Sequence, residues 1–564
     1  MGSPQPAGTD PQVVVLGVGP VGQTAALLLA RWGVRVLVLD ARPERDLVGS
    51  KALCQQRDVL DIWDSIGVGR QVADEGVTWT TSRTYYRDSE LFSVSFVDRG
   101  RSPFPPFVNV SQARTELLLD AAVAAQPLVT VRWGACVEKL QQGDGGVVLT
   151  LAGGEQLNVP WLLACAGVKA DDLRTGLGLT YPGRTFTDRF LICDIRAELP
   201  GWESERRFYF DPAWNPGRQV LIHPCPGSVF RIDWQVPPDY DLEQDEASGG
   251  LDARIRAIVG DKPYEVVWKS VYRFHSRHTE TMRTGRVLLA GDIAHVVAPF
   301  GARGLNSGVQ DAENASWKLA FVLHGWAPEA LLDSYSDERL AAALENIDVT
   351  DATMRFLVPQ DESERAHRLS VLEAALNDPA MRSEVNSGRL AEPFWYVDSP
   401  LTTTDPSRES AGRPASGHSP QPGVGVLLPD LPVTLDGATA RLRELARAGV
   451  LLLAADGPGE GADAKAVRML AEPLTGLAAP HRVLALSAID PDGSVRQALG
   501  ARPGEVWVVR PDAHVAAVVP AGDAQAVRRA VDRSLGYAEH DDSTHEPQTA
   551  DLEEASDALL PLGR

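Results

Sequence analysis

The sequence predicts an α/β protein with a Rossmann-type nucleotide-binding domain, an inserted mixed β-sheet and a small α/β domain near the C-terminus. Three observations carry this prediction. An apolar strand, a glycine-bearing turn and a helix open the chain. A second glycine-rich loop before a long helix follows much later. Between the two, alternating strands and helices give way to consecutive strands from about residue 181.

The first glycine segment follows the apolar run 13–16, which is typical of a buried parallel strand. Its turn consists of Gly17, Val18, Gly19, Pro20, Val21 and Gly22. A helix over 23–32 and a strand over 34–39 come next, and Asp40 ends that strand. The glycines permit the tight turn, the approach of a pyrophosphate and close helix–strand packing, while Asp40 suits a ribose. This pattern alone leaves NAD and FAD both open.

The second segment favours a flavin. An apolar strand over 286–290 ends in Gly291 and Asp292, which places a carboxylate at the carboxyl end of a strand. A loop rich in Pro and Gly covers 299–306, and a helix is expected over 307–325. Backbone amides of the loop and the helix N-terminus would stabilise negative charge on a flat ring, as on a reduced flavin. A purely structural glycine-rich turn is the alternative.

The residues GDIAH at 291–295, PFGARGLNSGVQDAEN at 299–314 and WKL at 317–319 resemble single-component FAD-dependent aromatic hydroxylases. This is the para-hydroxybenzoate hydroxylase-like group, and the residue pattern is most similar to its 3-(3-hydroxyphenyl)propionate hydroxylase branch. The resemblance covers roughly residues 11 to 400. The last α/β part resembles the thioredoxin-like C-terminal domain of larger members, although it contains no cysteine.

The resemblance implies a set of FAD-binding positions. Asp40, with Arg42 beside it, would hold the ribose, Lys51 would lie near the pyrophosphate, Gln112 would contact the flavin and Val137 would lie beside the adenine. The ADP half would rest on Gly17, Gly19, Pro20, Val21 and Gly22. The second segment would hold the pyrophosphate, the ribityl chain and the ring through Gly291, Asp292, Pro299, Gly301, Gly304, Leu305 and Asn306.

One departure from the family pattern concerns the reductant. The family's GADGxxSxxR motif, shared between FAD and NAD(P)H binding, corresponds to residues 164–174. Ala166 stands at the Asp position, Ala170 at the Ser position, and Arg174 lies one residue later than the pattern requires. NAD(P)H is the reductant that the resemblance implies. Either a modified site still accepts it, or reduction of the flavin is impaired or gated by substrate.

The resemblance implies an FAD-dependent monooxygenase. NAD(P)H would reduce FAD, O2 would give a flavin C4a-hydroperoxide, and OH would pass to a phenolic or polyketide-like aromatic substrate. The high content of Ala, Arg and Gly favours a role in secondary metabolism. The alternatives are a flavoprotein performing a non-hydroxylating oxidation, a Baeyer–Villiger step or a rearrangement, and a non-catalytic flavin-binding protein. No catalytic acid or base is assigned. Four side chains on the expected substrate sheet are interpreted as packing: Tyr209, His223, Trp234 and Tyr272.

Composition excludes several classes. The net charge of −22 argues against nucleic acid and anionic membranes as partners. Five cysteines without a CxxC spacing indicate a reducing, cytoplasmic location. No long apolar stretch or signal peptide is recognised. No metal site is expected, because His275 and His278 lack a carboxylate–His pattern. Asp61 and Asp64 are interpreted as helix-surface or loop residues.

The expected domain boundaries follow from these patterns. Residues 11–180 and 281–345 form the FAD-binding domain, while 82–104 join the substrate domain of residues 181–280. The rest divides into a disordered N-terminus (1–10), a helical segment (346–400), a linker (401–422), the thioredoxin-like domain (423–535) and an acidic flexible tail (536–564). The C-terminal domain is expected to serve packing or oligomer contact, which makes a homodimer one expected assembly.

Overall fold

The computed structural model describes residues 10–46, 52–96, 102–143, 145–404, 421–457 and 462–538. Its first layer is a six-stranded sheet in the order β17-β18-β11-β1-β2-β7, parallel except for β17. Its strands are β1 (Val13–Leu16), β2 (Val36–Leu39), β7 (Val129–Arg132), β11 (Trp161–Ala164), β17 (Arg283–Thr284) and β18 (Val287–Leu289). Ligands of such sheets bind at the carboxyl ends of the strands.

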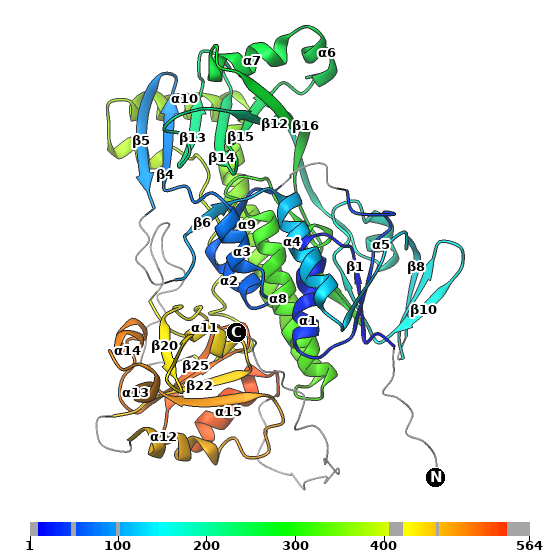
Figure 1. Ribbon diagram of the computed structural model, residues 1–564, viewed down its shortest axis with the longest axis vertical. Helices are drawn as coiled ribbons and strands as arrows, with labels where there is room; N and C mark the ends of the chain where they lie inside the picture. The colour runs from blue at the N-terminus through cyan, green and yellow to red at the C-terminus, as the bar shows by residue number, and fades with distance from the viewer. Residues whose placement is uncertain are drawn as a thin grey trace.

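Helices α1 (Pro20–Arg31), α4 (Gln112–Ala125) and α8 (Gly304–Leu323) run side by side through the middle of the molecule (Figure 1). Alanines at the contact between α1 and α8 let the two helices and the sheet share one core. The core includes Ala25, Ala26, Ala312, Ala315 and Leu319 together with the buried run of β1. Helix α8 is therefore buried along most of its length.

Smaller elements border the first sheet. Strands β8 (Val137–Gly143), β9 (Gly146–Leu151) and β10 (Gln156–Val159) form an antiparallel three-stranded sheet, followed by α5 (Asp171–Gly176). Strands β3 (Cys54–Gln56) and β6 (Phe107–Asn109) pair with each other. Helices α2 (Arg57–Asp64) and α3 (Gly69–Glu75) follow β3 directly.

The second layer is an eight-stranded sheet in the order β19-β16-β12-β15-β14-β13-β4-β5. Its strands are β4 (Thr81–Tyr86), β5 (Ser89–Ser95), β12 (Gly183–Ala197), β13 (Glu205–Phe210), β14 (Gln219–Cys225), β15 (Val229–Val236), β16 (Tyr264–His278) and β19 (His295–Val296). Residues 81–95 therefore pair with the inserted strands, because β4 runs parallel to β13.

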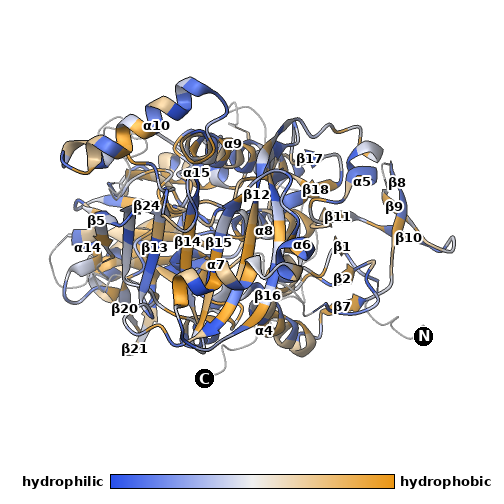
Figure 2. Cartoon of the chain, turned by 90° about the horizontal axis from the view of Figure 1, so that it is seen from above, coloured by the Kyte–Doolittle hydropathy of each residue, from blue (hydrophilic) through white to orange (hydrophobic). Residues whose placement is uncertain are grey.

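Helices cover both faces of this second sheet. Helices α6 (Leu242–Ala247) and α7 (Gly250–Val259) lie over one face, where Leu251 and Ile255 join a core with Ile232 and Trp234. Helices α9 (Asp333–Leu357) and α10 (Glu362–Ala375) lie over the other. Helix α10 shows hydrophobic and hydrophilic residues in turn along its length (Figure 2), as a surface helix with one buried stripe should.

The C-terminal part packs beside α8 and α9 as a separate body (Figure 1, yellow to red). A four-stranded sheet has the order β23-β22-β24-β25, and β20 pairs with β21. The elements are β20 (Pro432–Leu435), β21 (Ala438–Arg441), α11 (Leu442–Ala446), β22 (Val450–Ala455), α12 (Ala462–Ala471), β23 (His481–Ala485), α13 (Leu486–Ile489), α14 (Ser494–Leu499), β24 (Glu505–Val509), β25 (Val515–Pro520) and α15 (Ala524–Ser534). The resemblance to thioredoxin stays a prediction.

Buried ion pairs fasten this C-terminal domain to α2, α8 and α9. Glu338 accepts from Lys318 Nζ at 2.7 Å and from Arg510 Nη2 at 3.0 Å. Arg510 also binds Asp512, which accepts from the indole of Trp317 at 3.2 Å. Burial favours the neutral acid of Glu338, but the charges of Arg510 and Lys318 outweigh it and lower its pKa well below its usual range. The four charged groups stay ionised because each has an opposite charge beside it.

Two further arginines complete this junction. Arg443 Nη1 lies 2.7 Å from Asp58 and 3.3 Å from Asp61, and Arg447 binds Asp61 at 2.6 Å and Glu313 at 2.7 Å. Asp61 is therefore buried, and its interpretation as a helix-surface residue was wrong. The partner arginines lie almost 400 positions away, so no local pattern around residue 61 could reveal them.

Several expected boundaries shift. Helix α8 begins at Gly304 rather than at 307, and the strand expected over 34–39 begins at Val36. Ahead of β20, Leu427 forms an isolated bridge with His514. Within the described ranges, no helix has the length and apolar character needed to cross a membrane.

Replacing Glu338 by Gln tests the junction. Loss of this carboxylate leaves Lys318 and Arg510 buried with reduced compensation, so the free energy of unfolding should fall by about 3–5 kcal/mol. Urea unfolding followed by tryptophan fluorescence measures it. The matched control is Glu155→Gln, which removes a solvent-exposed partner of Arg132 and should leave the transition in place. Equal effects of the two substitutions would argue against the junction as a source of stability.

Candidate functional site

The turn after β1 has the geometry of a dinucleotide-binding turn. Gly17 adopts φ +102°, and a Cβ there would lie 2.5 Å from the carbonyl oxygen of Cys165. A Cβ on Gly22 would lie 2.0 Å from the carbonyl oxygen of Gly17. A Cβ on Gly19, the residue that caps α1, would meet no protein atom within 4 Å. Two glycines are thus required by packing, whereas Gly19 faces open space.

Pro20 and Val21 begin helix α1 directly after this turn. Pro20 occupies the first turn of α1, where a missing N–H costs no helical hydrogen bond. Val21 packs against Gly291 and Gly308, whose added Cβ atoms would lie 3.3 Å and 2.7 Å from its methyl group. The first glycine segment therefore touches the second through Val21.

Asp40 is held in place at the end of β2. Its carboxylate accepts the Val18 N–H at 2.8 Å and the Arg42 N–H at 2.9 Å, and it binds the Arg42 guanidinium. Burial opposes ionisation, but these hydrogen bonds outweigh it and keep the pKa of Asp40 below its usual range. The carboxylate is thus an ionised acceptor beside the turn, as ribose binding requires.

Two neighbours of this turn were not predicted from the sequence. Arg45 donates to the Val18 carbonyl at 2.9 Å and to Glu116 at 2.7 Å, so it braces the glycine turn. The ring of Trp133 lies 5.6 Å from the Arg42 guanidinium and 5.4 Å from that of Arg45. Trp133 therefore borders the arginine that binds Asp40. Val137, the residue expected beside the adenine, starts β8 and packs against the main core.

Gln112 and Lys51 are both predicted FAD-binding residues, but the structure describes only Gln112. Gln112 starts α4, where its amide accepts from the Ala52 N–H at 3.1 Å and donates to Glu116 at 2.8 Å. Because Glu116 also binds Arg45, Gln112 is connected to the glycine turn. Lys51 lies outside the described residues.

The second segment is organised by Asp311. Gly291 (φ +70°) donates its N–H to Asp311 at 3.0 Å, and His295 Nε2 lies 2.7 Å from the same oxygen. Arg339 Nε binds the other oxygen at 2.7 Å. Burial disfavours the Asp311 charge, yet His295 and Arg339 outweigh it and lower its pKa to about 2. His295 is therefore a structural partner of Asp311. Asp292 is exposed at the end of β18.

The loop from Pro299 to Asn306 is fixed on both sides. Gly301 adopts φ +84°, and its carbonyl accepts the Ala391 N–H at 2.7 Å. Arg303 donates to Asn346 at 2.6 Å. Asn306 accepts from the Gln56 N–H at 3.0 Å and donates to the Cys54 carbonyl at 3.0 Å, which ties the loop to β3.

The start of α8 is open in the same way as the start of α1. A Cβ on Gly304 would meet no protein atom within 4 Å, as at Gly19. Neither helix has a side-chain cap or an acidic residue in its first turn. Gly304, Leu305 and Asn306 therefore lie in a helical first turn, with amides suited to an anion. Two open, uncapped helix N-termini and the preformed Asp40 carboxylate fit the pyrophosphate, ring and ribose of FAD.

The segment with the missing Asp still lies beside this site. Ala166 is exposed after β11, and Arg174 donates to the Val168 carbonyl at 2.8 Å and to the Ile293 carbonyl at 3.2 Å. The Arg174 guanidinium lies 4.1 Å from the ring of Tyr181, whose hydroxyl donates to the Asp292 carbonyl at 2.7 Å. The substitution therefore removes a carboxylate without detaching the segment.

A line of polar side chains crosses the second sheet on the face turned away from α6 and α7. We name it the polar row: Ser82, Arg206, His223, Arg231 and Asp194. Ser82 pairs with Arg206, and His223 and Asp194 both lie opposite Arg231. The register of β13 and β14 places Arg206 opposite His223. Asp233 lies on the same face, two residues beyond Arg231 along β15.

The polar row borders the loop from Pro299 to Asn306, which we call the flavin loop. Arg206 Nη2 donates to the Ser387 carbonyl at 3.4 Å, and the next residue, Gly388, packs against Phe300. Burial raises the pKa of the Cys54 thiol in β3 to about 12, against the charge of Arg206. His223, which the sequence pattern assigns to packing, has no hydrogen-bond partner for its Nδ1 among the described residues.

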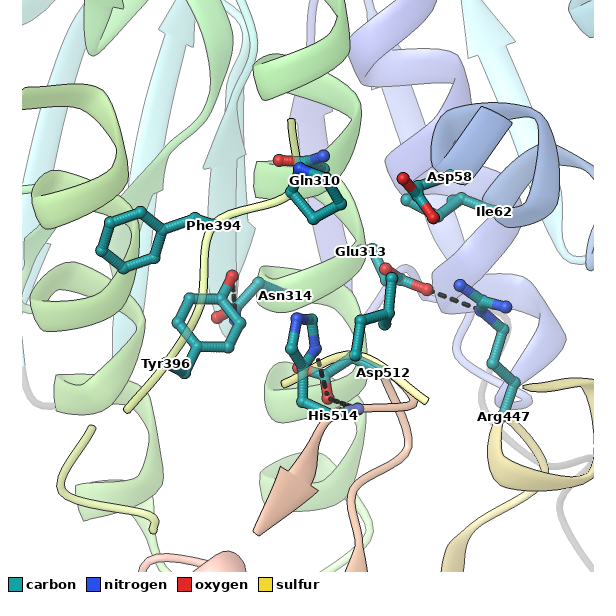
Figure 3. Close-up of a pocket in the computed structure, with 12 residues that line it drawn as sticks. Asp58, Ile62, Gln310, Glu313, Asn314, Phe394, Tyr396, Arg447, Asp512 and His514 are labelled. Carbon is teal, nitrogen blue, oxygen red and sulfur yellow. Dashed lines mark hydrogen bonds and ion pairs between the residues drawn. The ribbon is translucent and has the colours of Figure 1, made fainter. Parts of the chain in front are cut away.

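A small cavity at the domain junction is a different feature. Figure 3 shows Asn314 of α8 beside Tyr396, and Glu313 of the same helix turned toward Arg447. The cavity volume of about 20 Å³ accommodates a single water molecule. A cavity of this volume is too small for an aromatic substrate.

Comparison with known proteins identifies the class. The family model of the FAD binding domain matches residues 10–350, and that of the C-terminal part of aromatic-ring hydroxylases matches residues 421–538. The chain belongs to the FAD-binding domain family. Within it, the chain is a member of the FAD-dependent aromatic-ring hydroxylases, which are oxidoreductases. The predicted FAD cofactor and family resemblance are confirmed.

Individual relatives agree with this assignment. The chain is 29% identical to 6-methylpretetramide 4-monooxygenase of Streptomyces rimosus over 91% of both chains. It is 29% identical to a 3-(3-hydroxy-phenyl)propionate/3-hydroxycinnamic acid hydroxylase of Mycobacterium sp. (strain JLS), over 67% of this chain and 66% of the relative. The flavin-dependent monooxygenase PieE, solved with FAD and substrate, has a similar fold, with a TM-score of 0.79, 22% identity and coverage of 93% and 99%.

Alanine at Gly19 and at Gly22 should separate binding from folding. Gly19→Ala places a methyl group in open space, so the protein should fold normally but bind FAD about tenfold more weakly or worse, since the backbone must approach the pyrophosphate. Gly22→Ala should also lower the melting temperature of the flavin-free protein. Flavin absorbance after reconstitution and thermal unfolding measure these effects. Gly176→Ala, on exposed α5, is the control. Full FAD affinity in Gly19→Ala would contradict the assignment.

Proposed function

We propose that this protein hydroxylates an electron-rich, phenolic polycyclic substrate of the polyketide type, using O2 and NAD(P)H, in secondary metabolism. The observation that carries the proposal is the buried polar row beside the flavin loop, on a sheet otherwise lined by aromatic side chains. The alignment with 6-methylpretetramide 4-monooxygenase over 91% of both chains supports a substrate of this size and chemistry.

The residues of the site divide the work. FAD, when bound, supplies the electron transfer and oxygen activation. The chain binds its ADP half at the α1 turn and presents the amides of the α8 N-terminus to the ring. Phe190, Phe274 and Phe300 stack or meet edge-on at centroid distances of 4.5–6.0 Å and form an apolar wall near the loop. Such a wall excludes water and orients a flat ring system.

A second candidate function rests on Ala166. Without the family's carboxylate, the protein would perform a non-hydroxylating oxidation, a Baeyer–Villiger step or a rearrangement, with atypical reduction by NAD(P)H. A non-catalytic flavin-binding role is the limiting case of the same idea. For the assembly and location, we propose a homodimer in the cytoplasm, and light scattering of the purified protein measures the former.

Product analysis tests the proposed reaction. Flavin-loaded protein, NADPH and air-saturated buffer are incubated with a panel containing 6-methylpretetramide and 3-(3-hydroxyphenyl)propionate. We expect one oxygen atom to be added to the polycyclic phenol, with 18O2 labelling the product, and little turnover of the smaller acid. Oxidation without label from O2 would favour the second candidate function. Oxygen inserted between two carbons, seen as a lactone, would do so as well.

Anaerobic reduction tests the role of Ala166. We expect NADPH to bleach the flavin absorbance of the wild-type protein when an aromatic substrate is bound, because residues 168–174 still lie beside the site. The Ala166→Asp variant should need less NADPH for half-maximal rate, since it restores the family's carboxylate. Dithionite serves as the control for a reducible flavin. No bleaching by NADPH, with or without the substrate, would defeat the monooxygenase proposal.

A further inference from the structure

The charges in the polar row are not balanced. Arg231 forms a two-pronged pair with Asp194 at 2.8 Å and 2.9 Å. Arg206 is only 4% exposed and donates to two neutral oxygens, the Ser82 hydroxyl at 3.2 Å and the Ser387 carbonyl. Among the residues that the structure describes, no carboxylate forms an ion pair with Arg206. A buried cation without such a partner is costly, so a stabilising anion is expected from elsewhere.

Asp233 lies on the same face of the sheet, opposite Leu221 and two strands from Arg206, with an incomplete hydrogen-bond shell. Its Oδ1 is buried and has no partner in the described part of the chain. The charged groups that face it are Arg231 on its own strand, Asp194 on β12 and Arg206 on β13. Burial raises the pKa of Asp233 to about 7, with Asp194 adding to the effect and the two arginines opposing it. The carboxyl can therefore take up or release a proton near neutral pH.

His223 lies on the same face as these two groups. Burial, together with the charges of Arg206 and Arg231, lowers its pKa well below its usual value. The imidazole is therefore neutral, and its Nδ1 is directed at no partner within the described ranges. A neutral imidazole nitrogen offers one hydrogen-bond position that either donates or accepts according to its tautomer.

Unpaired buried polar atoms also occur elsewhere in the described chain, but here two of them share one face of the sheet with a buried guanidinium that has no carboxylate partner among the described residues. Buried polar atoms in folded proteins are nearly always paired, and exceptions concentrate at ligand sites. The three groups require a ligand atom that can exist in two forms. As an anion it accepts a hydrogen bond from the Arg206 guanidinium, and as a neutral group it donates one to the Asp233 carboxylate. An ionisable hydroxyl on an aromatic or enolised ring has both properties. Carboxylates accept from Arg206 but have no proton for Asp233 at neutral pH.

We propose that Arg206, His223 and Asp233 bind an ionisable ring hydroxyl of the substrate and that Asp233 removes its proton. The inference rests on the proposed function and names the chemistry at one edge of the substrate. The O–H bond of the hydroxyl breaks, its electron pair stays on the substrate oxygen, and the proton bonds to Asp233 Oδ1. Arg206 holds the resulting oxyanion and His223 orients it. The ring gains the electron density that an electrophilic oxygen requires.

A chromophoric phenol tests the anion-binding half. 4-Nitrophenol is titrated into flavin-loaded protein at several pH values, because its ionised and neutral forms absorb at different wavelengths. The wild-type protein should bind the ionised form preferentially and lower the pKa of the bound phenol by about one unit, a tenfold preference. Arg206→Met should abolish that preference, and Arg206→Lys should retain part of it. The matched control, Arg196→Met, removes an exposed arginine from the same sheet.

Flavin absorbance and melting temperature show whether each variant is folded and loaded. An unchanged pKa of the bound phenol in folded Arg206→Met would overturn the proposal. A folded wild-type protein that binds only the neutral phenol, or no phenol, would do so too. The titration requires no turnover, so its outcome is independent of whether the product analysis detects hydroxylation.

The pH profile tests the proton acceptor. Asp233 acts as a base only when ionised, so kcat of the wild-type protein should rise as the pH increases through about 7. Asp233→Asn should lose this rise and turn over about 100-fold more slowly. Its FAD content and melting temperature should not change. Asp233→Glu should restore a rise with pH. A wild-type profile in Asp233→Asn would remove Asp233 from the reaction, while hydroxylation itself would stand.

Discussion

The buried carboxylate of Asp311 is the interaction on which the flavin site depends. It accepts from Gly291 after the end of β18, from His295 of β19, which precedes the loop, and from Arg339 of α9. Arg339 in turn donates to the Ser307 carbonyl at 3.2 Å and to the Tyr396 hydroxyl at 3.0 Å. One negative charge thus fixes the strand end, the loop and the helix start in a single geometry.

Helix α8 carries that geometry to the rest of the molecule. Its first turn reaches β3 through Asn306, and its middle holds Asp311. Its later turns place Trp317 against Asp512 of the C-terminal domain and Lys318 against Glu338 of α9. Because α8 is buried along most of its length, a change in how that domain docks would shift the helix and the site at its first turn. The C-terminal domain has no cysteine, but it contributes to the site by packing against the later turns of α8.

The sequence predicts those parts of the site in which local chemistry and position coincide. Gly17, Gly22 and Asp40 flank one strand–helix–strand unit, and their roles are legible from turn geometry. The sequence places Gly304 in a loop because it belongs to the run 299–306, which is rich in Pro and Gly. In the structure α8 already begins at Gly304, because the turn that follows is buried. Trp133 was missed because an aromatic residue beside a strand is normally core. The second sheet was recognised as strands, but not the order in which they pair.

That order explains why the polar row could not be predicted. Its five members lie on five strands and share a face only after the sheet is assembled. Each side chain alone resembles an ordinary polar residue on a half-exposed strand. Their chemistry becomes visible only when burial is known, since burial converts isolated polar groups into costly ones.

The two buried polar regions of this protein differ in one informative way. At the domain junction, Lys318, Arg443, Arg447 and Arg510 each face a carboxylate within 3.0 Å, and the region holds two domains together. In the polar row, Arg231 has such a partner, but Arg206 binds only neutral oxygens, and the neighbouring Asp233 keeps an oxygen unpaired among the described residues. Burial alone therefore does not distinguish a structural network from a functional one. Charge balance distinguishes the two, because a network whose charges are all paired within the protein has no charged group available for a ligand.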